Sequence, residues 1–226
     1  MLPNHRMFKA VSLVGVVIAV GLVLLGWALI PATSPVSVAG VCAILIIYGA
    51  VFYFLLPRVS PDVAKWARLF GLLAGAVFAA EVLLEYALLP ENNTSWGIAE
   101  FGLVFALYFF SSFWAAYRSH RLGTGVLTAV LSAMVSSLLW LIVVLAVFYV
   151  FRGSDRQAQV FLSEGNYEDF TRSRMASIET FIMEDFLGGA FFHLLLGPAI
   201  AALLGLLGGA IGKLVARAAK SSFVHG

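Results

Sequence analysis

The chain has 226 residues, of which 62% are hydrophobic and 12% are charged, and its formal net charge is +2. A soluble domain carries roughly a quarter charged residues, so this composition excludes an ordinary water-soluble protein. The small net charge also argues against a nucleic-acid partner. The sequence therefore predicts an integral membrane protein whose main partner is the lipid bilayer.

Six apolar stretches are long enough to cross a bilayer as helices, which takes about 20 residues because no water satisfies the backbone there. They lie at residues 8–30, 36–56, 67–89, 95–117, 122–151 and 187–214. Prolines and glycines near their ends predict tight connections. We therefore expect an all-α fold, a polytopic bundle of six transmembrane helices that forms a single domain over residues 1–226.

Residues 152–186 form a long polar connection between the fifth and sixth spans. Ser154 and Gln157 have the spacing of a capping box, and Gly165 predicts a break between two short helices. Within 167–186, apolar residues recur at steps of three and four opposite an acidic face. We predict an extracytoplasmic amphipathic helical loop that lies on the membrane surface or caps the bundle.

Lysine and arginine near the span ends predict the orientation of the chain. In a six-span arrangement one side carries Arg6, Lys9, Arg58, Lys65, Arg68, Arg118, Arg121, Lys213, Arg217 and Lys220. The opposite side holds arginines only in the long loop, where acidic residues outnumber them. Both termini are therefore expected in the cytoplasm. The apolar chain with a glycine-stepped last span and a short basic tail resembles small bacterial inner-membrane proteins in general, so we expect it in that membrane.

Three glutamates and one histidine lie inside predicted spans, where a charged side chain costs roughly 2.5 to 3.5 kcal/mol. Glu81 and Glu85 share one face of the third span, and Glu100 and His193 are expected at a similar depth in the outer half of the membrane. Crowded carboxyl groups beside an imidazole are typical of a proton or cation site. The alternative is that neutral side chains hydrogen-bond across helices and hold the bundle together.

Small residues repeat at four-residue steps along the sixth span, at Gly197, Ala201, Gly205 and Gly209. This spacing allows a neighbouring helix to approach closely. The third span has a matching pair in Gly71 and Gly75, so we predict that the third and sixth spans pack against each other. The alternative is a homodimer through the sixth span.

Two other features lie within the predicted spans. Pro198 should kink the sixth span and free a carbonyl group one turn earlier, near His193. Thr128, Ser132 and Ser136 form a stripe of hydroxyl groups on the fifth span. Such groups in membrane helices usually bond their own or a neighbouring helix, although a transport path is the alternative.

The sequence has no GxSxG, HExxH, Walker or Rossmann motif, and one intramembrane histidine is too few for a haem pair or a histidine metal cluster. We therefore expect no catalytic residues, no metal and no cofactor. The first hypothesis for function is a non-enzymatic subunit, scaffold or accessory factor that binds a membrane-protein partner. The alternative is a small proton- or cation-coupled carrier or channel that uses Glu81, Glu85, Glu100 and His193. Lipid chemistry at the outer leaflet ranks last because it lacks a motif.

Overall fold

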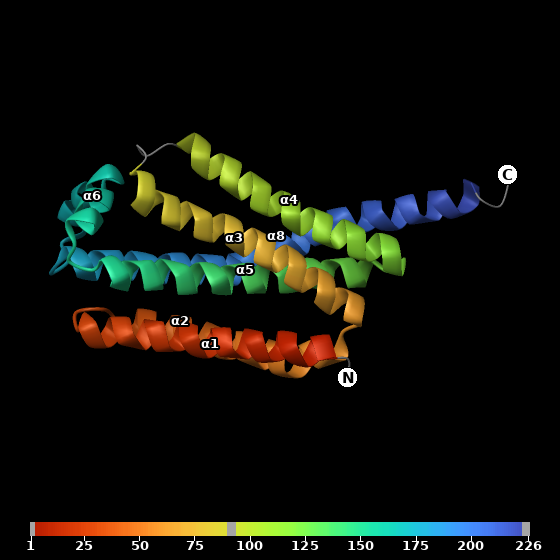
Figure 1. The fold of residues 1–226 in the computed structure, drawn as a ribbon, viewed down its shortest axis with the longest axis horizontal. Helices are drawn as coiled ribbons and strands as arrows, with labels where there is room; N and C mark the ends of the chain where they lie inside the picture. The colour runs from red at the N-terminus through yellow and green to blue at the C-terminus, as the bar shows by residue number, and fades with distance from the viewer. Residues whose placement is uncertain (1–2, 90–93, 223–226) are drawn as a thin grey trace.

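The computed structural model describes residues 3–89 and 94–222, and every regular element in this part of the chain is helical (Figure 1). The elements are α1 (Pro3–Leu29), α2 (Pro35–Ala50), the π-helical turn η1 (Val51–Leu55), the 3-10 turn η2 (Leu56–Arg58), α3 (Pro61–Leu88), α4 (Thr94–Ser119), α5 (Leu122–Phe151), α6 (Asp155–Ser163), α7 (Asn166–Ser173) and α8 (Ile178–Ser222). Six helices of the described chain are long and apolar enough to cross a membrane, as the sequence predicted. The length and composition of these helices suit a multi-pass helical membrane protein.

Two of the prolines near the predicted span ends begin the following helices. Pro35 and Pro61 occupy the first turns of α2 and α3, where a missing backbone N–H costs no hydrogen bond. The preceding serines cap these helices, because Ser34 Oγ accepts from the backbone N–H of Ser37 and Ser60 Oγ accepts from the backbone N–H of Val63. Each short connection therefore ends one helix and starts the next.

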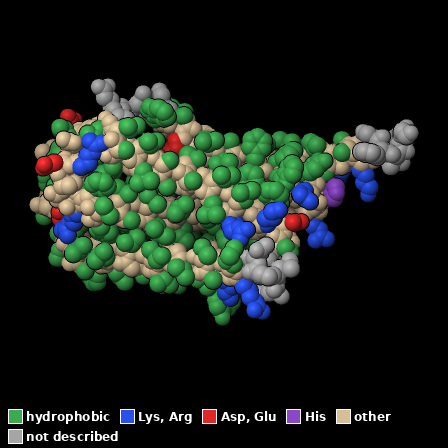
Figure 2. All heavy atoms as spheres, viewed as in Figure 1, with side chains coloured by type: hydrophobic (Ala, Val, Ile, Leu, Met, Phe, Trp, Pro, Cys, Tyr) green, Lys and Arg blue, Asp and Glu red, His purple; other side chains and the backbone are tan. Residues whose placement is uncertain are grey.

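Helix α5 is the central helix of the bundle. It packs against α1, α3, α4 and α8, and 67% of its most apolar stretch is buried, compared with at most 33% in the other five spans. The apolar side chains of those outer helices cover the visible surface between the two ends of the molecule (Figure 2). A helix without any charged side chain, as α5 is, suits this central position.

The glycines of α3 face α5. A Cβ atom added to Gly71 would lie 2.7 Å from the Cβ of Val135, and one added to Gly75 would lie 2.8 Å from a methyl group of Leu139. The predicted close packing of these glycines against the sixth span is therefore wrong. Helix α5 packs extensively on both α3 and α8, so its side chains fill the groove of α3.

The four-residue ladder on α8 also packs against α5. A Cβ atom on Gly197 would lie 3.1 Å from Ser137 Oγ, and one on Gly205 would lie 3.1 Å from the Cα of Val126. Ala201, between these two glycines, is fully buried. The ladder is thus a packing surface, but its partner is the central helix.

A second row of glycines on α8 faces α4. A Cβ atom on Gly208 or Gly212 would clash with the carbonyl oxygens of Phe109 and Phe113, respectively. Gly209 lies between the two rows, where a Cβ atom would come within 2.9 Å of a leucine methyl group of α5 and 3.0 Å of a serine hydroxyl of α4. These glycines bring the backbones of α4 and α8 into direct contact.

The long connection contains the two predicted helices, but the second is shorter than expected. Ser154 Oγ accepts from the backbone N–H of Gln157 at 3.2 Å and starts α6, as its spacing predicted. Helix α7 ends at Ser173, next to Arg174, whose φ of 59° stops the helix. Residues 178–186 belong to α8, so assigning them to a separate loop helix was wrong. Their three- and four-residue apolar periodicity runs unbroken into the last span, and no helix-ending residue separates the two.

The two ends of the bundle differ in charge. The beginning of α1 and the end of α8 lie at one end, and α6 and α7 cover the other (Figure 1). Most of the visible lysines and arginines gather at the first end, and acidic side chains are visible at the second (Figure 2). This arrangement agrees with an even number of spans.

Candidate functional site

Carboxyl groups from three parts of the chain come together at the end of the bundle covered by α6 and α7. Glu81 and Glu85 lie four residues apart on α3, on one face of the helix. The Glu100 carboxyl of α4 lies beside that of Glu81, and the Glu164 carboxyl, at the end of α6, lies beside that of Glu85. We call these four residues the carboxyl cluster. The structure thus places the three predicted glutamates together and adds Glu164.

The described basic side chains near the carboxyl cluster have other partners. Arg152 forms an ion pair with Glu179 at 2.8 Å. The Arg156 guanidinium donates to the carbonyl oxygens of Tyr86 and Ala87 and so caps the end of α3. Among the described residues, neither of the two ion pairs includes a member of the cluster. Neighbouring carboxyl groups in a medium of low dielectric constant need a proton or a bound cation between them.

Two members of the carboxyl cluster show the effect of burial directly. One oxygen of Glu100, Oε1, is buried and has no hydrogen-bond partner among the described residues. Burial raises the pKa of Glu164, although a hydrogen bond from the Asn166 amide at 3.0 Å acts in the opposite direction. All four members of the cluster are half-buried, so their carboxyl groups are partly shielded from solvent.

His193 lies next to this region but is surrounded by aromatic rings. Its imidazole stacks on Trp140 with the ring centres 4.2 Å apart, and its centre is 5.1 Å from Phe78 and 6.0 Å from Phe101. Phe78 is one helical turn from Glu81, so the rings lie close to the carboxyl cluster. The described contacts of the imidazole are with aromatic rings, so the structure does not bring His193 into the carboxyl cluster itself.

A small cavity of about 20 Å³ adjoins the imidazole. Its walls are formed by Phe78, Phe101, Val104, Phe105, Tyr108, Ser137, Phe192, His193, Gly197 and Ile200. This volume is close to the minimum that holds one water molecule. The Tyr108 hydroxyl lies 2.6 Å from Ser136 Oγ, and Ser137 Oγ donates to the His193 carbonyl at 2.8 Å, so the hydroxyl groups at the walls already have partners.

Three helices each donate a hydrogen bond to the backbone of α8. The Tyr48 hydroxyl of α2 donates to the Leu194 carbonyl at 2.8 Å, and the Ser137 hydroxyl of α5 donates to the His193 carbonyl. Ser112 of α4 donates to the Gly205 carbonyl at 2.5 Å. Buried hydroxyl groups that bond across helices hold a membrane bundle together because lipid offers them no partner.

The bond from Tyr48 has a specific cause in the sequence. Pro198 has no N–H group, so the carbonyl oxygen of Leu194, four residues earlier, loses its helical partner. The predicted free carbonyl therefore exists at Leu194, next to His193. Sequence reasoning missed the donor, because Tyr48 lies 146 residues away in the chain and no local pattern connects the two.

The hydroxyl stripe of α5 bonds largely within its own helix. Thr128 donates to the Thr124 carbonyl at 2.7 Å, and Ser132 donates to the Thr128 carbonyl at 2.8 Å. Ser136 donates to the Ala133 carbonyl at 3.0 Å. The stripe follows the usual behaviour of hydroxyl groups in membrane helices and supplies no argument for a transport path.

Glu184, near the start of α8, caps α2. One of its carboxylate oxygens accepts from the Ser34 backbone N–H, and the other accepts from Ser37 Oγ at 2.7 Å. A carboxylate at this position complements the positive end of the helix dipole. Glu184 therefore fastens α8 to the turn between α1 and α2.

The chemistry of the carboxyl cluster has to be argued from its own geometry. The described residues contain no group of three or more histidine, cysteine, aspartate or glutamate side chains arranged to hold a metal ion. The chain matches no family model, no curated protein and no solved structure.

Proposed function

We propose that this multi-pass membrane protein is a non-enzymatic subunit, scaffold or accessory factor of a membrane assembly. The observation that carries the proposal is that buried hydroxyl groups donate hydrogen bonds from one helix to another. Tyr48, Ser112 and Ser137 come from three different helices, and each donates to a backbone carbonyl of α8. These hydrogen bonds between helices fix one arrangement of the bundle. A rigid bundle suits a scaffold better than a carrier, which must alternate between two states.

The proposed orientation follows from the positive-inside rule, with the basic end of the bundle and both termini in the cytoplasm. In this orientation α6 and α7 face the outside. The general resemblance of the sequence to small bacterial inner-membrane proteins supports a bacterial inner membrane as its location. The polar surface of α6 and α7, which carries both acidic and basic side chains, then offers a site for a membrane-protein partner. The alternative of a second copy of the chain, packed through α8, is supported less, because the glycine ladder of that helix is covered by α5.

A proton- or cation-coupled carrier is the second candidate, and the carboxyl cluster is the observation that favours it. Glu81, Glu85, Glu100 and Glu164 lie together, and the described ion pairs do not include them. A site of this kind binds protons or cations in carriers. In this proposal Glu81 is the central residue, because it lies deepest along α3.

Flux measurements distinguish the two candidates. The full-length protein is reconstituted into vesicles that contain a pH-sensitive dye, and proton, sodium and potassium gradients are imposed in turn. For a scaffold we expect flux equal to that of protein-free vesicles. The same assay is run with Glu81→Gln, which keeps the shape and hydrogen-bonding capacity of the side chain but removes its titratable proton.

Flux that appears with the wild-type protein and disappears with Glu81→Gln would replace the scaffold by the carrier. Glu168→Gln is the matched control, because it removes a carboxyl group from the exposed face of α7. A direct test of the scaffold is mass spectrometry of the protein extracted with its native lipid. A partner subunit in fixed stoichiometry supports the proposal, and a bare monomer contradicts it.

A further inference from the structure

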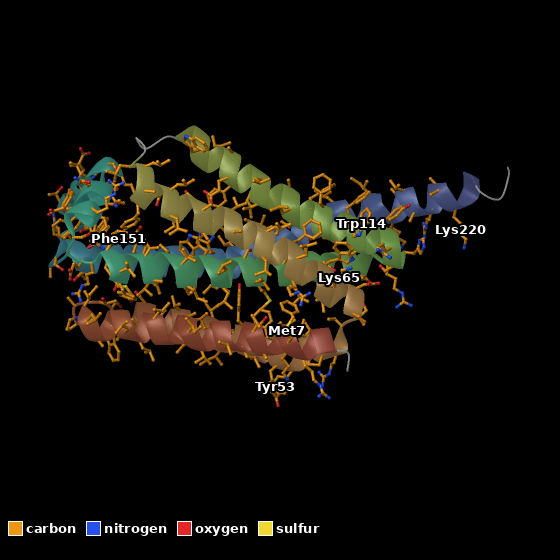
Figure 3. The ribbon with its side chains drawn as sticks, viewed as in Figure 1. Met7, Tyr53, Lys65, Trp114, Phe151 and Lys220 are labelled. Atoms are coloured by element: carbon orange, nitrogen blue, oxygen red, sulfur yellow. The ribbon has the colours of Figure 1, made fainter. Side chains whose placement is uncertain are left out.

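Helix α8 is longer than a membrane span requires. It has 45 residues, which corresponds to about 67 Å at 1.5 Å per residue. A bilayer measures about 40 to 45 Å including its headgroups. The excess lies at the end of the chain, where α8 extends past the other helices (Figure 1). Lys220 lies well beyond Trp114 and Lys65 in the same direction (Figure 3).

The last part of α8, residues 213–222, is called the α8 tail here; Ala216 is still buried against the bundle, and the helix projects beyond it. Lys213, Arg217 and Lys220 follow one another at steps of four and three residues, so they lie on one face of the helix. Leu214 and Val215 lie on other faces and are 62% and 44% exposed. The tail is therefore an amphipathic helix with a basic face and an apolar face.

The surroundings of the tail add to its positive charge. Arg118 and Arg121, which are exposed, lie at the end of α4 and the start of α5, and α4 packs along α8 up to Gly212. Among the described acidic residues, Asp62 is the one at this end of the bundle. A strongly basic surface next to exposed leucine and valine suits neither bulk water nor the hydrocarbon interior.

We propose that the α8 tail binds the headgroups of anionic phospholipids in the leaflet at this end of the bundle. The basic face pairs with the phosphate groups, and Leu214 and Val215 enter the adjoining acyl region. Under the positive-inside rule the cations only orient the chain. Binding of lipid headgroups requires more, namely three charges on one face of the helix and an apolar face beside them. Lipid is the occupant that satisfies both faces at once. The inference is independent of the scaffold or carrier role.

A fluorescent probe on the tail tests the proposal in the full-length protein. An environment-sensitive dye is attached at Ala219→Cys on a Cys42→Ala background, and the protein is reconstituted into vesicles of phosphatidylcholine alone or with one third phosphatidylglycerol. We expect a blue shift of the dye emission only in the anionic vesicles, reversed by high salt. Equal emission in both vesicles, or a shift that salt does not reverse, would overturn the proposal.

Two charge variants identify the surface. The variant Lys213→Gln/Arg217→Gln/Lys220→Gln should weaken the response to phosphatidylglycerol by about tenfold or more, since each basic residue near such a surface contributes to binding. The matched control Arg58→Gln/Lys65→Gln/Arg68→Gln removes the same charge at the same end of the bundle. An equal loss in both variants would mean that general positive charge is responsible and would contradict the assignment to the tail.

Two further measurements separate the alternatives. Soluble glycerophosphate added to the anionic vesicles should leave the emission unchanged; full competition would show a free-phosphate site and would overturn binding of the apolar face to lipid. If the tail instead binds a protein, the blue shift will appear in native membranes and be missing from pure lipid vesicles. The salt titration of the wild-type protein keeps the test decisive if the triple variant fails to fold.

Discussion

Single residues in this bundle act mainly by completing hydrogen bonds that the helices leave open. Pro198 removes one helical donor, and the Tyr48 hydroxyl replaces it at the Leu194 carbonyl. Arg156 satisfies two carbonyl groups at the end of α3 in the same way. A buried carbonyl group without a partner costs free energy, so each of these side chains is expected to matter for stability.

Replacing Tyr48 with phenylalanine should lower the free energy of unfolding by about 1 kcal/mol, because the Leu194 carbonyl then has no donor. Unfolding in mixed detergent micelles measures the loss. Tyr53→Phe is the matched control, since the side chain of Tyr53 is 51% exposed and the change leaves its contact with Lys9 in place. It should unfold like the wild type.

A double variant isolates the cause. Pro198→Ala restores a backbone N–H four residues after Leu194, so α8 regains its own hydrogen bond. Adding Tyr48→Phe to Pro198→Ala should then cost clearly less than Tyr48→Phe alone. Equal costs in the two backgrounds would show that the tyrosine hydroxyl does not compensate for the proline.

Glu164 provides a prediction about pH. Burial raises its pKa above the ordinary value of 4.5, so the folded protein binds this proton more tightly than the unfolded chain. The resulting contribution to stability is complete below pH 4.5 and is lost as the pH rises through the folded-state value. Glu164→Gln should therefore be more stable than the wild type at neutral pH, and the difference should shrink in acid.

Denaturation curves over a range of pH measure this difference, and Glu168→Gln is the control on the neighbouring helix. A Glu164→Gln variant whose advantage is constant with pH would contradict a buried carboxyl group at this position. One that is less stable than the wild type at neutral pH would contradict it as well.

At the scale of helices, glycine decides which backbones touch. The row that contains Gly208 and Gly212 brings α8 against the backbone of α4, and Gly71 and Gly75 receive the side chains of α5. Helix α8 runs without a break from the segment after α7 to the α8 tail, because no residue between Ile178 and Ser222 ends it.

Gly208→Ala and Gly212→Ala should each destabilise the protein by about 1 to 3 kcal/mol, because the new methyl group meets a backbone carbonyl oxygen that cannot move aside. Gly188→Ala is the control on the same helix, where a Cβ atom meets no other atom within 4 Å. It should be neutral or slightly stabilising, since alanine favours a helix. Thermal unfolding in detergent compares the three. Three equal values would show that α4 and α8 do not pack this closely.

At the scale of the whole molecule, the charge difference between the two ends predicts the orientation in the membrane. On a Cys42→Ala background, Ala176→Cys between α7 and α8 should react with an impermeant thiol reagent in intact cells. Ala219→Cys in the α8 tail should react only after the cells are opened. Neither change alters a charge, so the topology signal is preserved. Labelling of Ala219→Cys from outside would invert the proposed orientation.

The candidate site was predictable in part. A four-residue step places Glu81 and Glu85 on one face of a helix, and adjacent spans that run in opposite directions bring Glu100 to their level, so helical geometry alone favours their meeting. The place of Glu164 was not predictable, because it depends on how α6 folds back over the bundle. The aromatic surroundings of His193 also depend on α3, α4 and α5, which meet it only in the tertiary structure.

The sequence by itself determined the all-helical fold, the six long apolar helices and the sorting of charge between the two ends. These properties follow from local composition and from the length of helix that a bilayer requires. The tertiary structure decided that α5 is the centre and that the glycines of α3 and α8 pack against it instead of each other. Small residues show that a helix accepts a close neighbour, but many helices can fill such a groove. The choice among them depends on the shapes of all six helices together.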